Sequence, residues 1–202
     1  MTEVSINKQV KLSQHFTLGE LCKTGVKTAD GNIPSHVHIE NLKRVCEWLE
    51  ELRRRYNQQY VCENEERSVS PPELGGARGG LNEGMSGASS DHPAHTGTPP
   101  NLGGEKDTEE PIIISSGYRS QELNKKVGGS PTSNHLTGCA VDIRVYGVEQ
   151  AMRYAVILMD YADETKQDYD ELLIERNRSG GYWLHFAVRP KDNRRKTKFL
   201  QK

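Results

Sequence analysis

Two histidines and one aspartate stand where they could hold a metal ion. Asp142 lies between Val141 and Ile143 in an apolar run, and His135 comes seven positions before it. Because side chains alternate along a strand, Val141 and Ile143 share one face and Asp142 must point to the other, where a carboxylate among apolar neighbours needs a partner. His185 interrupts a second apolar run. Two imidazoles and one carboxylate form the ligand set of a catalytic zinc site, which keeps a fourth position open for water.

Such a zinc ion would polarise a carbonyl group and lower the pKa of its bound water, and hydrolysis also needs a general base nearby. Glu175 ends an apolar segment next in line to the segment of His185, and it is our candidate for that base. Spacing alone does not bring these residues together. His185 by itself is more often a core or surface histidine, and Asp142 could cap a neighbouring element.

Secondary-structure signals predict how these residues are positioned. Thr17 and Glu20 form a capping-box pattern, which predicts a short helix from Leu18. Apolar residues at three- and four-residue steps predict an amphipathic helix from Ser35 to about Gln58. The other predicted elements are strands at 111–115, 139–145, 171–175 and 182–188, and helices at 120–127 and 148–159. This order indicates an α+β fold with a small, mainly antiparallel sheet covered by helices on one face.

One long segment differs in composition from the rest. Residues 70–110 contain nine of the 19 glycines and five of the nine prolines, and no Val, Ile, Phe, Tyr, Trp or Cys. Such a segment cannot bury enough apolar surface to offset the entropy lost on ordering. We therefore predict a single domain over 1–202 that is interrupted by a disordered insertion at 63–110.

Composition and charge exclude several classes of protein. A formal net charge of -1 lacks the basic footprint of a nucleic-acid-binding protein. The chain has no run of 18 apolar residues to span a membrane, and its first ten residues show no signal peptide. The four cysteines are widely spaced, which favours free thiols over disulfides or a thiolate zinc site. We expect a monomer that binds neither nucleic acid nor membrane and is cytoplasmic at synthesis.

Several of these segments together resemble the zinc D-Ala-D-Ala carboxypeptidase family, which has the hedgehog/DD-peptidase fold. Within this family, the N-terminal motif resembles that of the peptidoglycan-peptidase branch. The resemblance to the family covers nearly the whole chain outside residues 62–110. The motifs that carry it are Leu12-Ser-x-His-Phe16, Ser115-Ser-Gly-Tyr-Arg119-Ser, Val127-Gly-Gly-Ser130, Ser133-Asn-His135-Leu-Thr-Gly138-Cys-Ala-Val-Asp142, Asp170-Glu-Leu-Leu-Ile-Glu175 and Trp183-Leu-His185.

The resemblance implies a role for each matched residue. His135, Asp142 and His185 would bind one Zn²⁺ per chain. Arg119 would hold the substrate carboxylate or the developing oxyanion, a role that suits its planar guanidinium. Ser133 matches a position that lines the substrate pocket in related dipeptidases. Cleavage in the family uses zinc-bound water, with a carboxylate that acts first as base and then as acid.

The position of that carboxylate is a departure from part of the family. Several members carry it three residues before the last histidine, where this chain has Tyr182. In the branch resembled here the acid lies on the preceding strand, which points to Glu175. Asp170 and Glu171 remain alternatives, and Glu171 stands where the branch often has Gln.

Three hypotheses about function follow. The first is a zinc metallopeptidase that hydrolyses peptidoglycan stem peptides, as a D,D-carboxypeptidase or an endopeptidase. A phage lysin released to the cell wall on lysis, or a protein carried on a virion, would fit it. The second is a non-catalytic zinc-containing module of the same fold that binds the wall or builds a virion. The third is an interaction protein without metal, which would leave Asp142 unexplained.

Overall fold

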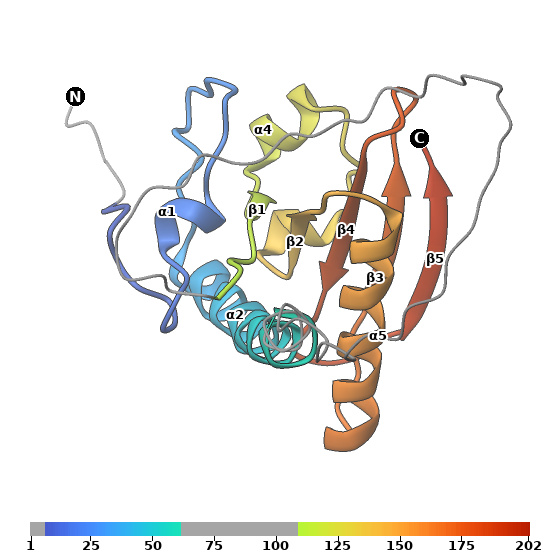
Figure 1. The fold of residues 1–202 in the computed structure, drawn as a ribbon. Helices are drawn as coiled ribbons and strands as arrows, with labels where there is room; N and C mark the ends of the chain where they lie inside the picture. The colour runs from blue at the N-terminus through green and yellow to red at the C-terminus, as the bar shows by residue number, and fades with distance from the viewer. Residues whose placement is uncertain (1–6, 62–108) are drawn as a thin grey trace, which may run out of the picture.

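The computed structural model describes residues 7–61 and 109–202 and contains one five-stranded sheet (Figure 1). The order across the sheet is β1-β2-β4-β3-β5, and neighbouring strands are antiparallel except for the parallel pair of β3 and β5. The strands are β1 (Ile114–Ser116), β2 (Ala140–Arg144), β3 (Glu171–Arg176), β4 (Tyr182–Ala187) and β5 (Lys196–Gln201). This architecture confirms the predicted α+β fold with a mainly antiparallel sheet.

The predicted helices are present, and polar side chains cap the start of three of the four α-helices. They are α1 (Leu18–Leu21), α2 (His36–Tyr56), α4 (Gln121–Lys126) and α5 (Val148–Thr165), with a π-helical turn at Asn57–Val61 (η1) and a 3₁₀ helix at Asn134–Thr137 (η2). Thr17 forms the expected capping box with Glu20, and Ser35 and Ser120 cap α2 and α4. Each cap satisfies backbone N–H groups that have no partner within the helix.

The hydrophobic core lies between the sheet and the two long helices. α2 packs against α5 and β2, and α5 packs against β3 and β4, so both helices cover the same face of the sheet (Figure 1). Val141 and Leu184 enter this core from the sheet, and Trp48 of α2 lies with its ring centroid 5.4 Å from that of Phe186. Burying one such large side chain contributes about 2–3 kcal/mol. The opposite face of the sheet is therefore free for polar residues.

The structure differs from the sequence-based prediction at three places. The strand expected at 111–115 is paired only from Ile114 onward, so β1 is shorter and shifted. The helix expected to end near Met159 continues to Thr165. Strand β5 was missed because most of its residues are exposed and it alternates lysines with few apolar residues, as an edge strand does.

The predicted disordered insertion falls almost wholly on residues 62–108, which lie outside the described part of the chain. Its last residue by our prediction, Glu110, is in fact bound by the buried Asn57 at the end of α2, through both its backbone N–H and its carbonyl. The returning chain is therefore anchored close to the point where α2 ends.

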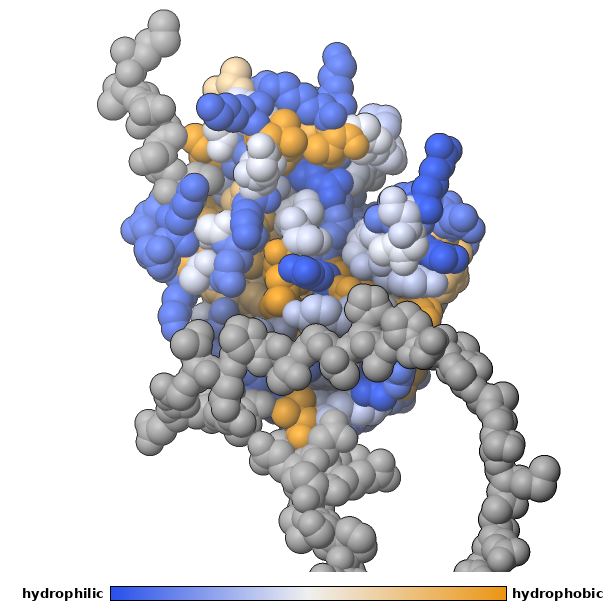
Figure 2. Space-filling model, turned by 45° about the horizontal axis from the view of Figure 1, so that its top comes forward, coloured by the Kyte–Doolittle hydropathy of each residue, from blue (hydrophilic) through white to orange (hydrophobic). Residues whose placement is uncertain are grey.

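The described residues also bear on membrane-spanning helices, on the cysteines and on the character of the surface. No helix within residues 7–61 and 109–202 is long and apolar enough to cross a membrane. Cys22, Cys46 and Cys139 are free thiols, as predicted. The face shown in Figure 2 is largely hydrophilic, with its apolar side chains in small patches.

Candidate metal centre

Asp142, His135 and His185 meet on the open face of the sheet. Asp142 of β2 pairs directly with His185 of β4, and η2 brings His135 over the same point. The Oδ1 atom of Asp142 is 2.9 Å from Nδ1 of His185 and 3.3 Å from Nε2 of His135. One possible ligand atom from each of the three residues lies within 4.8 Å of the others. The three residues are at most 9% exposed, so the predicted set forms a compact and largely buried cluster.

Further contacts fix the orientation of each member of the cluster. The Nδ1 of His135 donates to the carbonyl of Gly117 at 2.7 Å, which turns its Nε2 toward Asp142. Arg119 donates through Nη2 to Oδ2 of Asp142 at 2.5 Å, and its Nε donates to the hydroxyl of Ser116. Outer partners of this kind orient metal ligands and set which imidazole nitrogen carries the proton. Oδ1 of Asp142 is left facing both histidines.

Local backbone geometry explains the residue types around His135. Ser133 caps η2, and its hydroxyl accepts a hydrogen bond from the backbone N–H of His135 at 3.3 Å. Gly138 ends η2 with φ +71°, a left-handed conformation that favours glycine. A Cβ at Gly138 would also lie 2.6 Å from the carbonyl oxygen of His38. Glycine is therefore required for the sharp turn that joins His135 to β2.

The electrostatics of the cluster suit a cation. Burial lowers the pKa of His135, so this imidazole is neutral and able to act as a ligand at neutral pH. Burial acts to raise the pKa of Asp142, but the two histidines outweigh it and hold that pKa well below its usual range. Burial also acts to lower the pKa of His185, yet its contacts with Asp142 and Glu171 raise it to about 9. Because metal ligands must be deprotonated, His185 would release a proton on binding a metal. Two neutral imidazoles and one ionised carboxylate, each with an outer partner, then fit the donor set that zinc prefers.

A cleft of about 700 Å³ opens above the cluster. Its lining includes Arg119 and Ser133, and their roles toward a substrate stay predictions. Leu173 and Trp183 supply apolar wall, and four basic side chains reach the cleft, namely Arg119, Arg194, Lys196 and Lys202. A substrate with a peptide backbone and carboxylate groups matches this mixture of charge and apolar surface.

Two glutamates of β3 flank the metal cluster. His185 pairs with Leu173 of β3, and Glu171 and Glu175 lie two residues before and two residues after Leu173. Both therefore point to the face that carries His185, and both line the cleft. Glu175 is 2% exposed, and its Oε2 accepts a hydrogen bond from the Nζ of Lys202 at 2.6 Å. Its other carboxylate oxygen has no hydrogen bond within the described residues.

The third candidate acid, Asp170, is placed for a structural role. It is fully buried and does not line the cleft. Its carboxylate accepts hydrogen bonds from Nε and Nη2 of Arg194 and from Nδ2 of Asn134, and it pairs with Arg189 at 2.7 Å. A carboxylate with all its acceptor positions in use is poorly suited to transfer a proton in the cleft.

Tyr182 takes no part in the cluster. Its side chain packs on the core side of β4 and contacts the ring of Phe199, with ring centroids 6.1 Å apart. An acid at this position of this chain would point away from His185, because the two residues are an odd number of positions apart on one strand. The absence of an acid there therefore says nothing against catalysis.

The sequence analysis did not identify several residues that contact the metal cluster or line its cleft. The Gly117 carbonyl, Asn134 and the basic residues of the C-terminal segment had no assigned role. Asn134 adjoins His135 in the recognised motif and could have been noticed. Lys196 and Lys202 reach the site only because β5 runs parallel to β3, which no local pattern indicates.

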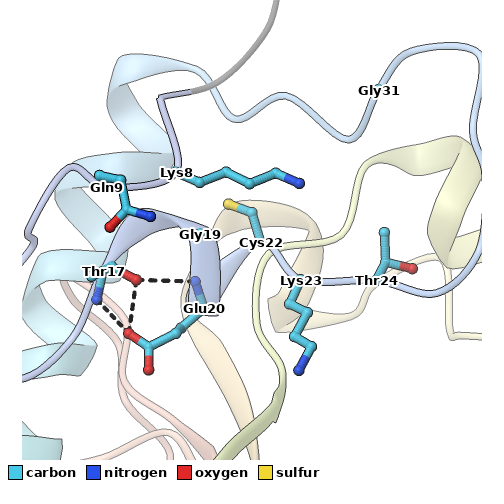
Figure 3. Close-up of a pocket in the computed structure, with 9 residues that line it drawn as sticks. All are labelled: Lys8, Gln9, Thr17, Gly19, Glu20, Cys22, Lys23, Thr24 and Gly31. Atoms are coloured by element: carbon cyan, nitrogen blue, oxygen red, sulfur yellow. Dashed lines mark hydrogen bonds between the residues drawn. The ribbon is translucent and has the colours of Figure 1, made fainter.

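A separate hollow near α1 contains none of the predicted site residues (Figure 3). The close-up shows the capping box of Thr17 and Glu20 at its edge, with the thiol of Cys22 and the side chain of Lys8 nearby. Burial raises the pKa of Cys22 to about 12, so this thiol is not activated. The hollow offers no cluster of reactive groups comparable with the cleft.

Comparison with known families agrees with the geometry. Residues 104–167 match the family model described as Peptidase M15. The match supports the peptidase M15 family. It spans Arg119, Ser133, His135 and Asp142, whereas Glu175 and His185 lie beyond the matched segment. M15 peptidases are zinc-dependent and have the hedgehog/DD-peptidase-like fold. No curated protein matches the chain.

Proposed function

We propose that this protein is a zinc metallopeptidase that hydrolyses peptide bonds in peptidoglycan stem peptides. One observation carries the proposal: His135, Asp142 and His185 converge at the floor of a cleft that also holds a buried carboxylate, Glu175. The family match supports the class of reaction, and the motif resemblance described above supports the substrate class. We propose one zinc ion per chain, held by these three residues.

The residues of the chain divide the work of hydrolysis. Zinc, when bound, would supply Lewis-acid polarisation of the scissile carbonyl and would lower the pKa of the attacking water. Glu175 accepts a proton from that water on the oxygen that Lys202 leaves unoccupied and then donates it to the departing amine. Arg119 holds Asp142 in place and presents its positive charge to the cleft, where it attracts a substrate carboxylate or the developing oxyanion. Ser133 borders the bound peptide.

The test uses the purified, zinc-loaded full chain and two defined substrates. One is a synthetic stem peptide that ends in D-Ala-D-Ala, and the other is a cross-linked pair of stem peptides without a free D-Ala-D-Ala end. Mass spectrometry of the products distinguishes release of one D-Ala from cleavage of the cross-link. A peptide that ends in L-Ala-L-Ala and a His135→Ala variant serve as controls.

We expect cleavage of at least one D-configured substrate by the wild-type chain and none by His135→Ala. Release of D-Ala would identify a carboxypeptidase, and cleavage of the cross-link an endopeptidase. A chain that binds zinc and cleaves neither substrate would overturn the proposed reaction and favour the non-catalytic wall-binding module.

A further inference from the structure

We infer that Glu171 is a positioning residue, whose carboxylate holds the imidazole of His185 in the orientation that presents Nδ1 to the metal. The inference deepens the proposed function and rests on its metal centre, but not on its substrate.

The two nitrogens of His185 face different carboxylates. Its Nδ1 lies 2.9 Å from Oδ1 of Asp142, on the side of the cluster where His135 also points. Its Nε2 lies 3.6 Å from Oε2 of Glu171. An imidazole that ligates a metal through one nitrogen carries its proton on the other, and a carboxylate or carbonyl beside that second nitrogen fixes the tautomer and the ring. Glu171 stands at that place for His185, as the Gly117 carbonyl does for His135.

Glu171 is itself held firmly. Its Oε2 accepts a hydrogen bond from Nδ2 of Asn134 at 3.1 Å, and its Oε1 accepts one from Nζ of Lys196 at 2.7 Å. Arg194 pairs with Oε1 at 3.1 Å. Because Asn134 immediately precedes His135 in η2, the Glu171 side chain connects the segment that carries one histidine to the strand that carries the other. A side chain with three donors and a fixed place can restrain a ring, whereas it is poorly placed to collect and release protons.

The arrangement separates Glu171 and its neighbour Asp170 by role. Glu171 lies outside the group of three whose ligand atoms converge, so it is not itself a ligand. Asp170 shares Asn134 and Arg194 with Glu171 but does not contact His185. A comparison of positions 170 and 171 therefore isolates the contact with His185 from the rest of the network.

The experiment measures zinc affinity of the full chain by competition with a chelator of known affinity. The variants are Glu171→Leu, Glu171→Gln and, as the matched control, Asp170→Asn. We expect Glu171→Leu to bind zinc about 10- to 100-fold more weakly, the usual cost of losing an outer partner of a metal ligand. Glu171→Gln should lose less, because its carbonyl oxygen can still lie beside Nε2. Asp170→Asn, measured at a temperature at which its melting curve shows it to be folded, should keep the wild-type zinc affinity.

A second readout is the visible spectrum of the cobalt-substituted protein, which reports ligand geometry without any substrate. It should change in Glu171→Leu, recover in part in Glu171→Gln and stay unchanged in Asp170→Asn. Equal zinc affinity in the wild type and Glu171→Leu would overturn the inference, as would equal losses in Glu171→Leu and Asp170→Asn. A wild-type chain that binds zinc through Glu171-dependent geometry yet cleaves no stem peptide would overturn the proposed reaction alone.

Discussion

Replacing Glu175 by Gln should remove most of the peptidase activity and leave the metal in place. The substitution keeps the shape of a residue that is 2% exposed and removes its negative charge and its ability to take up a proton. General base catalysis contributes about 10²- to 10⁴-fold to a rate, which corresponds to about 3–5 kcal/mol of activation free energy. Within residues 7–61 and 109–202, the Glu175 side chain has one hydrogen bond, from Lys202, whose side chain is 59% exposed. Weakening this ion pair should therefore cost about 1 kcal/mol of stability or less.

The assay compares kcat, zinc content and thermal stability of the wild type and Glu175→Gln on the substrate that the wild type cleaves. Glu149→Gln is the matched control, because Glu149 lies on α5 with a largely exposed side chain paired to Arg153. We expect kcat to fall at least about 100-fold in Glu175→Gln, with zinc content unchanged, and to stay at the wild-type value in Glu149→Gln. Near-normal kcat in Glu175→Gln would show that another group takes the proton and would refute the assignment.

Two further substitutions test the surroundings of the centre. Asp170→Asn should destabilise the fold by about 1–3 kcal/mol, because this fully buried carboxylate accepts charge-assisted hydrogen bonds from Arg194 and pairs with Arg189. The folded-state pKa of Asp170 lies below its ordinary value, since Arg194, Asn134 and Arg189 outweigh the effect of burial. Its contribution is therefore full above the unfolded-state pKa of about 4 and is lost as the pH falls through the folded-state pKa. Thermal melts from pH 7 down to pH 2 should show this acid-dependent loss in the wild type and much less of it in Asp170→Asn; parallel curves would contradict the assignment. Gly138→Ala should lower stability by at least about 1 kcal/mol and weaken zinc binding, because φ is +71° and the new Cβ meets the carbonyl of His38. Unchanged melting and zinc affinity in Gly138→Ala would show that this turn does not need glycine.

The elements that carry the metal ligands were predictable because their apolar residues have a clear period. Val141 and Ile143 had to share the core face of a strand, so Asp142 had to face the other way, and the structure confirms it. The same alternation predicted that His185 lies on the face of its strand opposite to that of Leu184 and Phe186. What the pattern could not supply was the register of β2 against β4, which puts Asp142 directly beside His185. That pairing followed from family resemblance and not from local physics.

The supporting residues were harder to predict for a physical reason. Glu171 and Glu175 lie on one face of one strand, and the sequence does not reveal which of them meets the histidine. Their roles depend on donors from distant parts of the chain, namely Asn134, Lys196 and Lys202. Two of those donors flank or belong to β5, an exposed edge strand whose pairing comes from tertiary contacts and leaves little trace in hydrophobic periodicity.

Metal content of the purified protein tests the central claim most directly. Inductively coupled plasma mass spectrometry would be run on the wild type, His185→Ala and His36→Ala after the same zinc reconstitution and buffer exchange. His36 is the matched control, because its exposed imidazole lies at the start of α2, outside the cluster. We expect about one zinc per chain in the wild type and in His36→Ala, and a large loss in His185→Ala. A wild-type chain without zinc, or a His185→Ala chain that retains it fully, would contradict the proposed metal centre.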